Sequence, residues 1–264
     1  MKAIELLFEI AELPRFGLAA PLSTAYGGDF GIDASRTYAN FVSSVDGVVA
    51  LPGGVESGHV ISGTNEADRF VMALLRACAD AVVIGAGTFR QTPGASWHAA
   101  DAYPALADLF ADLRKQLGLR PQPLLVVVTA SGNIDAARPA AQDALIATTR
   151  AGEKRLNGTL PASARIVVLD PHVVPLVSLF GLLRSEGLGR LLAEGGPTLL
   201  GELVKPGLID ELFLTLSPRL FGRGPSDGKK ALIDGVELDG RSLELASARC
   251  HGSHLFLRYM LARS

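Results

Sequence analysis

The sequence predicts an α/β protein with a mostly parallel central sheet, helices on both faces and an antiparallel hairpin at one edge. Between residues 38 and 217, short apolar runs that suit buried strands alternate with segments whose apolar residues recur at helical spacing. The last two segments, Ser242–Cys250 and His254–Leu261, instead alternate like paired strands that turn at Gly252-Ser253.

The composition limits the class of protein. A chain of 264 residues with 48% hydrophobic residues can bury one large core or two small ones. A net charge of −2 and the lack of a basic run predict no nucleic-acid partner. The two cysteines form no CxxC pair, so we expect no disulfide framework, no metal site and a reducing cytoplasm. Acidic residues interrupt the N-terminal apolar run, and we expect no membrane partner.

Residues 1–35 are predicted to form an N-terminal extension, and residues 36–264 the domain proper. Prolines and glycines interrupt the extension, and only Ile4–Ala11 has helical character. We expect the extension to pack over the surface or against a partner subunit.

The first predicted strand, Tyr38–Val45, runs directly into Asp46-Gly47 and a glycine-rich loop, Val48–Gly58. A carboxylate at a strand end, followed by a loop that can close over a ligand, suits catalysis. An ordinary Asp-Gly turn is the alternative.

A helix follows, with an apolar face at regular helical spacing. Thr64 is expected to cap it, and Glu66 and Asp68 suit its positive N-terminal end. Arg76 lies off the apolar stripe near the other end, where it could contact an anionic substrate or compensate the helix dipole at the surface. The apolar face comprises Ala67, Phe70, Val71, Leu74, Leu75 and Cys78.

Two later strands end in glycine turns. The strand from Ala81 leads into Gly85-Ala86-Gly87-Thr88, which lacks the third glycine of the GxGxxG fingerprint. The strand from Arg190 ends at Glu194 and continues as Gly195-Gly196-Pro197, with proline at the expected first helical position. A strand, a glycine turn and a helix N-terminus make an anion site, because free backbone N–H groups point outward. An ordinary strand-to-helix turn is the alternative.

The remaining segments complete the alternation. Predicted strands cover Leu124–Val128, Leu145–Thr149, Ile166–Leu169 and Glu211–Ser217, and a helix covers Val173–Leu183. Polar residues at two of these strand ends could hold a ribose 2′-phosphate, namely Thr129, Ser131 and Arg150. Four further residues are expected to serve packing or solvated surface rather than a catalytic or metal pair: Trp97, His98, His251 and His254.

Four of these motifs fall at the carboxyl ends of predicted parallel strands: Asp46, Gly85–Thr88, Thr129–Ser131 and Glu194–Thr198. Sheets of this class bind ligands beyond those ends. We therefore expect the four motifs to border one cleft.

The motifs also stand in the order of a known family. They are Ser43-Ser-Val-Asp-Gly47, Leu75-Arg-Ala77 with Ala79–Thr88, and Glu194-Gly-Gly-Pro-Thr-Leu-Leu200 with Leu208-Ile-Asp-Glu-Leu212. Over residues 38–261 the chain resembles the C-terminal reductase domain of bifunctional riboflavin-biosynthesis proteins, in the dihydrofolate-reductase-like superfamily. The resemblance implies that fold, a homodimer, and NADPH-dependent reduction of a small molecule, 5-amino-6-(5-phosphoribosylamino)uracil, to its ribitylamino product.

The resemblance implies roles for individual residues. Asp46, Arg76 and Glu194 match substrate-contacting positions, and Asp46 is also the candidate for moving the proton that the reduction requires. Glu194 could accept hydrogen bonds from pyrimidine N–H groups, and Arg76 could pair with the substrate phosphate. The implied NADPH contacts are Ser43, Gly85, Gly87, Thr88, Ser131, Gly195, Gly196, Pro197, Thr198 and Leu199.

The chain departs from this family in two ways. Phe89-Arg-Gln-Thr-Pro-Gly-Ala-Ser96 stands where the resembled enzymes have an Asp-x-Pro stretch that leads to a substrate-binding arginine, so Arg90 is the expected replacement. The zinc-deaminase signature is absent from the sequence, which implies a stand-alone reductase. Two alternatives stay open: a reductase of dihydrofolate or another pterin-like ring, and a non-catalytic nucleotide-binding protein.

Overall fold

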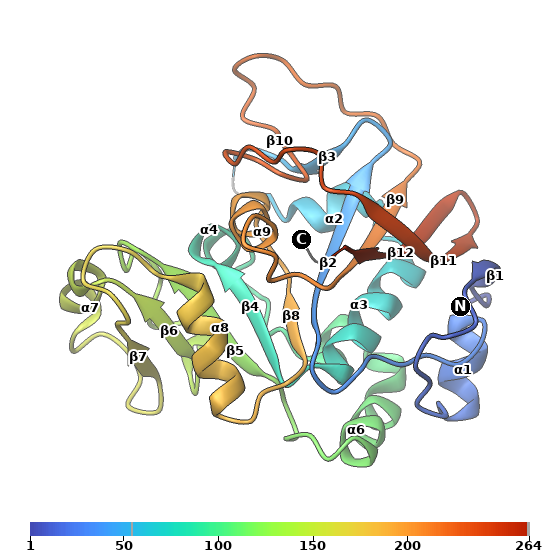
Figure 1. The fold of residues 1–264 in the computed structure, drawn as a ribbon, viewed down its shortest axis with the longest axis horizontal. Coiled ribbons are helices and arrows are strands. Elements are labelled where there is room, and N and C mark those ends of the chain that lie inside the picture. The colour runs from blue at the N-terminus through green and yellow to red at the C-terminus, as the bar shows by residue number, and fades with distance from the viewer. Residues whose placement is uncertain (54, 263–264) are drawn as a thin grey trace.

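The computed structural model describes residues 1–53 and 55–262, and within them the main strands form a single ten-stranded sheet (Figure 1). A smaller two-stranded sheet pairs β3 (Val48–Ala50) with β10 (Lys230–Ala231). In spatial order the large sheet contains β1 (Glu5–Glu9), β11 (Leu243–His251), β12 (His254–Leu261), β9 (Glu211–Ser217), β2 (Thr37–Ser44), β8 (Leu191–Ala193), β4 (Ala81–Gly85), β5 (Leu124–Thr129), β6 (Leu145–Thr148) and β7 (Arg165–Val167).

The strands from β9 to β7 in this order are parallel, whereas β12, β11 and β1 continue the sheet antiparallel. In register, Ala39 of β2 lies opposite Ala193 of β8 and Leu212 of β9. Parallel strands covered on both faces require apolar side chains in succession, and β4 supplies them with the sequence AVVIG. The predicted fold class, a mostly parallel sheet with an antiparallel C-terminal hairpin, is confirmed.

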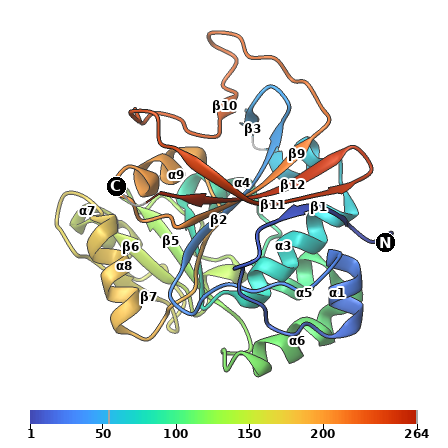
Figure 2. The ribbon, with the colours of Figure 1, turned by 45° about the vertical axis from the view of Figure 1, so that its right-hand side comes forward.

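Helices cover both faces of the sheet (Figure 2). Along β4, Val82 and Ile84 pack on one face with α1, α3, α5 and α6, while Ala81 and Val83 pack on the other with α8 and α9. The helices are α1 (Ala20–Tyr26), α2 (Ser57–Ser62), α3 (Glu66–Cys78), α4 (Ala86–Gln91), α5 (Ala99–Ala102), α6 (Ala107–Gln116), α7 (Arg150–Leu156), α8 (Leu176–Ser185) and α9 (Pro197–Val204). Two short 3-10 turns cover Pro104–Leu106 and Pro139–Ala141. None of the helices in the described chain is long and apolar enough to span a membrane.

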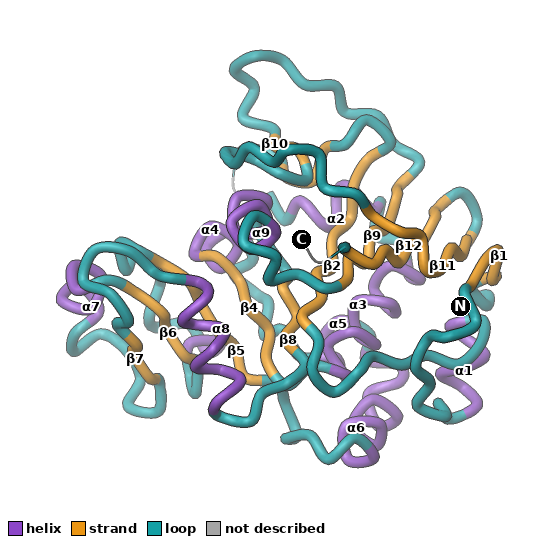
Figure 3. Tube along the Cα trace, in the orientation of Figure 1, coloured by secondary structure: helices purple, strands orange, loops and turns teal. Residues whose placement is uncertain are grey.

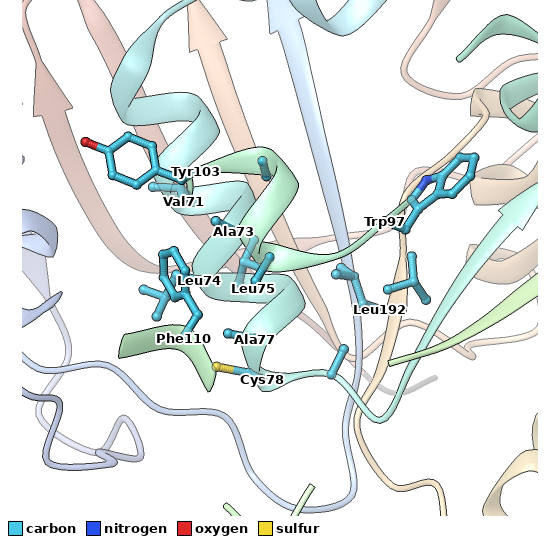
Figure 4. Close-up of a cluster of buried hydrophobic side chains, with 14 of the residues drawn as sticks. Val71, Ala73, Leu74, Leu75, Ala77, Cys78, Trp97, Tyr103, Phe110 and Leu192 are labelled. Carbon is cyan, nitrogen blue, oxygen red and sulfur yellow. The ribbon is translucent and has the colours of Figure 1, made fainter. Parts of the chain in front are cut away.

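Helix α3 forms the centre of one core cluster. Figure 4 shows Val71, Leu74 and Cys78 of this helix packed with Tyr103 and Phe110. The predicted apolar face is therefore the buried one.

The cap of α3 is one residue further along than predicted. Asn65 caps the helix, because its side-chain oxygen accepts a hydrogen bond of 3.0 Å from the Asp68 backbone N–H. The Thr64 hydroxyl instead donates to the Gly63 carbonyl, and Thr64 itself has a φ of 57°.

The helical prediction for Ile4–Ala11 is wrong, because β1 occupies this segment and pairs with β11. The extension is also joined to the main core. Ile4, Leu22 and Phe30 belong to the same buried cluster as α3. In addition, the Arg249 guanidinium pairs with Glu9 at 2.6 Å.

The segment predicted as a glycine-rich loop, Val48–Gly58, contains β3 and the beginning of α2; residue 54 lies outside the described residues. Val48 is fully buried, and its β-branched side chain suits a strand. The long connection from β9 to β11, residues 218–242, carries β10 back to pair with β3 (Figure 3). Helix α8 begins at Leu176 rather than at Val173, because Pro175 disfavours helical geometry in the residue before it.

Candidate active site

A cavity of about 780 Å³ lies at the carboxyl ends of β2, β8 and β4, bordered by α2, α3, α4, β3 and the start of α9. Its volume falls within the range of small-molecule sites. Its position is the one where α/β sheets bind ligands.

The two glycine turns meet at this cavity. The Gly85 backbone N–H donates to the Gly195 carbonyl at 2.9 Å. Gly195 has a φ of 122°, and a Cβ atom added to it would lie 2.9 Å from the Thr88 hydroxyl oxygen. Its peptide bond to Gly196 is cis. Glycine is therefore required at position 195 both by its backbone conformation and by the close approach of Thr88.

Helices α4 and α9 both begin at this cavity, and neither has a side-chain N-cap. The first N–H groups of a helix have no intrahelical acceptor, and the helix dipole favours an anion near them. A Cβ atom added to Gly87 would meet nothing within 4 Å, so there is open space beside this turn. Such an arrangement can hold phosphate groups. The predicted cofactor residues that line the cavity are Gly85, Gly87, Thr88, Gly195, Gly196, Pro197, Thr198 and Leu199.

Glu194 and Arg76 form an ion pair in the cavity wall. The Arg76 guanidinium donates to Glu194 Oε2 from Nη2 at 2.7 Å and from Nε at 2.9 Å. The side chain of Arg76 is only 9% exposed and that of Glu194 only 5%. Arg76 is therefore not a surface residue that compensates the helix dipole. Among the described residues, the second carboxylate oxygen, Oε1, has a single long contact of 3.5 Å, from the Asn40 amide. It can therefore accept hydrogen bonds from a ligand.

Asp46 does not line this cavity. Its carboxylate accepts hydrogen bonds from the Ser44 hydroxyl at 2.5 Å and from the backbone N–H groups of Phe221 and Gly222. The Ser44 hydrogen bond is the main cause that lowers the Asp46 pKa. In this structure Asp46 therefore holds the loop after Arg219 through its hydrogen bonds.

Ser43 and Ser131 also lie outside the cavity lining. The buried Ser43 hydroxyl donates to the Ser44 carbonyl at 2.8 Å. Ser131 is exposed just after β5. Of the other residues expected near a ribose phosphate, Thr129 accepts a hydrogen bond from the Gly132 N–H and Arg150 pairs with Glu153 at 2.6 Å.

The segment that departs from the expected family pattern is held by a buried stack. Phe89 and Trp97 are parallel, with ring centroids 5.7 Å apart. The Arg138 guanidinium lies 4.2 Å from the Phe89 ring centroid and donates to the Phe89 and Thr92 carbonyls. Trp97 packs as predicted, although it also lines the cavity. Arg90 lines the cavity as well, and its guanidinium donates to the Asn133 carbonyl at 2.7 Å.

Sequence reasoning missed Asp68 and Met72, which line the cavity together with Arg76. Their spacing of four residues places all three on one side of α3. That spacing is visible in the sequence, but an acidic residue in the first turn of a helix is also expected from the helix dipole alone. Burial raises the pKa of Asp68 to about 6, the opposite of the change expected for such a residue.

The histidine and cysteine residues do not form a metal centre. Within residues 1–53 and 55–262, no three His, Cys, Asp or Glu side chains are arranged to hold a metal ion. His254 is not solvated as predicted, because its ring contacts the Asn65 amide at 3.0 Å and the Ser62 carbonyl at 2.9 Å.

Comparisons with known proteins agree with this architecture. A relative from Archaeoglobus fulgidus, 2,5-diamino-6-ribosylamino-4(3H)-pyrimidinone 5′-phosphate reductase, is 28% identical over 80% of this chain and 96% of its own length. Riboflavin biosynthesis protein RibD of Escherichia coli is 27% identical over 68% of this chain and 47% of its own length. The crystal structure of a pyrimidine reductase-like protein from Corynebacterium diphtheriae shares the fold, with a TM-score of 0.70 at 22% identity, over 87% of this chain and 93% of that one. The model of the RibD C-terminal domain matches residues 37–257, so the chain belongs to the RibD C-terminal domain family.

Proposed function

We propose that this chain is an NADPH-dependent reductase of riboflavin biosynthesis that converts the ribosyl group of a 6-ribosylaminopyrimidine 5′-phosphate into a ribityl group. The observation that carries the proposal is the position of the Glu194–Arg76 pair in one cavity with the two glycine turns and the uncapped N-terminus of α9. A carboxylate suits ring N–H groups, and helix N-termini suit phosphates.

The substrate class includes two pyrimidines that differ at ring position 2. The sequence resemblance implies the uracil form, which carries an oxo group there. The name of the Archaeoglobus fulgidus relative specifies the 2,5-diamino form, and that relative matches this chain over nearly its whole length. Both forms carry the ribosylamino group that is reduced, so the reaction is the same for either.

The residues of the two glycine turns fit the cofactor. Gly85, Gly87 and the first turn of α9 would hold the pyrophosphate and the nicotinamide side of NADPH. Ser131 would contact the adenosine end, since β5 lies directly beside β4 in the sheet. Bound NADPH would supply a hydride.

Glu194 would accept hydrogen bonds from the pyrimidine ring through its less occupied oxygen, Oε1. Arg76 would fix the orientation of that carboxylate through its two hydrogen bonds to Oε2. Fixing a carboxylate in this way reduces the free-energy cost of ordering it when substrate binds.

The test is NADPH consumption, followed at 340 nm, by the purified protein with each of three substrates. These are the uracil form, the 2,5-diamino form and dihydrofolate. We expect turnover of at least one ribosylaminopyrimidine phosphate, with a ribitylamino product that is two mass units heavier. Turnover of dihydrofolate alone would favour the pterin-like alternative. NADPH binding without turnover of any substrate would favour the non-catalytic one.

We also propose that the protein is a cytoplasmic homodimer. Edge strand β1 exposes Leu6, Leu7 and Phe8 in succession, and its outer edge has no strand beside it among the described residues. Both cysteines are free, which suits a reducing compartment. Sedimentation should give a dimer for the unmodified protein and a monomer for Leu7→Lys. A dimer in both would show that β1 is not the interface.

A further inference from the structure

Asp68 is a carboxyl group that lines the cavity, and no described Lys, Arg or His side chain forms an ion pair with it. It lies in the first turn of α3, and Met72 and Arg76 follow it along the same cavity-lining side. Arg76 is committed to Glu194, so it does not neutralise Asp68. The side chain of Asp68 is partly exposed.

The groups around Asp68 position its carboxyl group, and they act on its protonation in opposite directions. The Thr215 hydroxyl in β9 hydrogen-bonds to it. The Ser62 hydroxyl in α2 also lowers its pKa and has a 3.5 Å contact to the His59 carbonyl; both residues are almost fully buried. Two charged or titratable groups on neighbouring elements act on Asp68 in opposite directions: His59 of α2 favours the ionised form, and Glu194 after β8 opposes it. On its own helix, Arg69 and Arg76 also line the cavity.

Burial disfavours the ionised form of Asp68 more strongly than the two hydroxyl groups and His59 favour it. The pKa of Asp68 is therefore raised to about 6. A fraction of the molecules therefore carries a proton at this position near neutral pH. An acid whose pKa lies close to the working pH is suited to donate a proton and to regain it from solvent.

Asp46 has none of these properties. It lies outside the cavity lining, its oxygens are occupied by the Ser44 hydroxyl and two backbone N–H groups, and its pKa is lowered. Two other carboxyl groups of the cavity lining, Glu56 and Asp101, have exposed side chains, at 40% and 58%.

We propose that Asp68 is the proton donor in the reduction, an inference that rests on the proposed function. When the ribose ring is open, its C1′ is joined to the amino nitrogen by a C=N double bond. C1′ accepts the hydride, the π electron pair moves to the nitrogen, and that nitrogen takes the proton from the Asp68 carboxyl group. The Asp68 carboxylate then regains a proton from water, so that one NADPH and one proton are consumed per substrate reduced.

The first test compares Asp68→Asn with Glu66→Gln, which removes a carboxylate from the same helical turn outside the cavity lining. For the unmodified protein, kcat should fall about tenfold per pH unit above the pKa of the acid. Asp68→Asn should lower kcat at least about 100-fold, abolish this pH dependence and leave the Kd for NADPH unchanged. Glu66→Gln should retain both the rate and the pH profile. Thermal unfolding of each variant checks that it is folded.

The second test moves the pKa without removing the acid. Thr215→Val removes a hydroxyl that lowers the Asp68 pKa, so the fall in kcat should shift to higher pH. Ser217→Ala is the matched control, because this buried hydroxyl two residues along β9 has no hydrogen-bond partner among the described residues. In protein labelled with 13C at the aspartate carboxyl groups, NMR without cofactor should show one signal with a midpoint near pH 6. That signal should be missing in Asp68→Asn and shifted upward in Thr215→Val.

The outcomes separate the two proposals. If the unmodified protein reduces neither ribosylaminopyrimidine phosphate, the proposed function fails together with the reaction assigned to Asp68. If it does reduce one, but Asp68→Asn keeps its kcat and pH profile, or changes only KM, then only the role of Asp68 is overturned. An unchanged profile in Thr215→Val would also overturn that role.

Discussion

Glu194→Gln should impair substrate use far more than NADPH binding. The substitution keeps the shape of the side chain and one acceptor oxygen but removes the negative charge. A hydrogen bond to a charged group contributes about 1.5–3 kcal/mol, so losing this charge should lower kcat/KM about 10- to 100-fold. The proposed NADPH contacts lie on the neighbouring glycine turns, so the Kd for NADPH should change less than about threefold, under 1 kcal/mol.

The same substitution also has a cost in stability. Removing one partner of a buried ion pair typically costs about 3–5 kcal/mol, and Gln should cost less because its amide oxygen can still accept from Arg76. Glu186→Gln is the matched control, because it weakens an exposed pair with Arg165 that is worth about 0–1 kcal/mol. Steady-state kinetics, NADPH titration and urea unfolding give the three quantities. Equal losses in kcat/KM and in NADPH affinity would refute the placement of Glu194 on the substrate side.

Three further predictions follow from other parts of the fold. Gly195→Ala should weaken NADPH binding at least about tenfold by fluorescence titration, because the new Cβ atom would press on the Thr88 hydroxyl and the positive φ disfavours alanine; unchanged affinity would contradict this. Because the Asp68 pKa is raised on folding, the carboxyl group costs stability as pH rises from about 4 to 6. Relative to the unmodified protein, Asp68→Asn should therefore gain about 2–3 kcal/mol in urea unfolding over that range, and a constant difference would contradict the raised pKa. Glu9→Ala leaves the buried Arg249 guanidinium unpaired, so it should cost about 3 kcal/mol and speed amide exchange in β1, whereas unchanged exchange would show that the pair does not hold the extension.

The strands and their carboxyl ends could be predicted because they depend on local pattern. Glu211–Ser217 matches β9, and the turn at Gly252-Ser253 separates β11 from β12, since apolar runs and turn residues specify these features locally. The meeting of the two glycine turns also followed from pattern, because parallel strands that end together place their turns on one edge.

The remaining features depend on long-range packing. The local pattern predicts a helix at Ile4–Ala11. The segment instead forms β1, because it pairs with β11 near the other end of the sequence. The ion pair of Arg76 with Glu194 joins α3 to the turn after β8, 118 residues later. The raised pKa of Asp68 arises from burial, which no spacing of residues reveals. The partners of Asp46 could not be predicted either. Its carboxylate at the end of a strand accepts hydrogen bonds from the backbone of a loop about 175 residues later.

We propose that one cavity at the carboxyl ends of β2, β8 and β4 holds both the reductant and the pyrimidine. A crystal structure of the protein with NADP⁺ and a ribosylaminopyrimidine phosphate tests it most directly. We expect the cofactor phosphates at the glycine turns, the pyrimidine ring against Glu194, the nicotinamide facing C1′, and the Asp68 carboxyl group within hydrogen-bond reach of the amino nitrogen. A pyrimidine bound away from Glu194, or a cofactor bound away from the glycine turns, would contradict it.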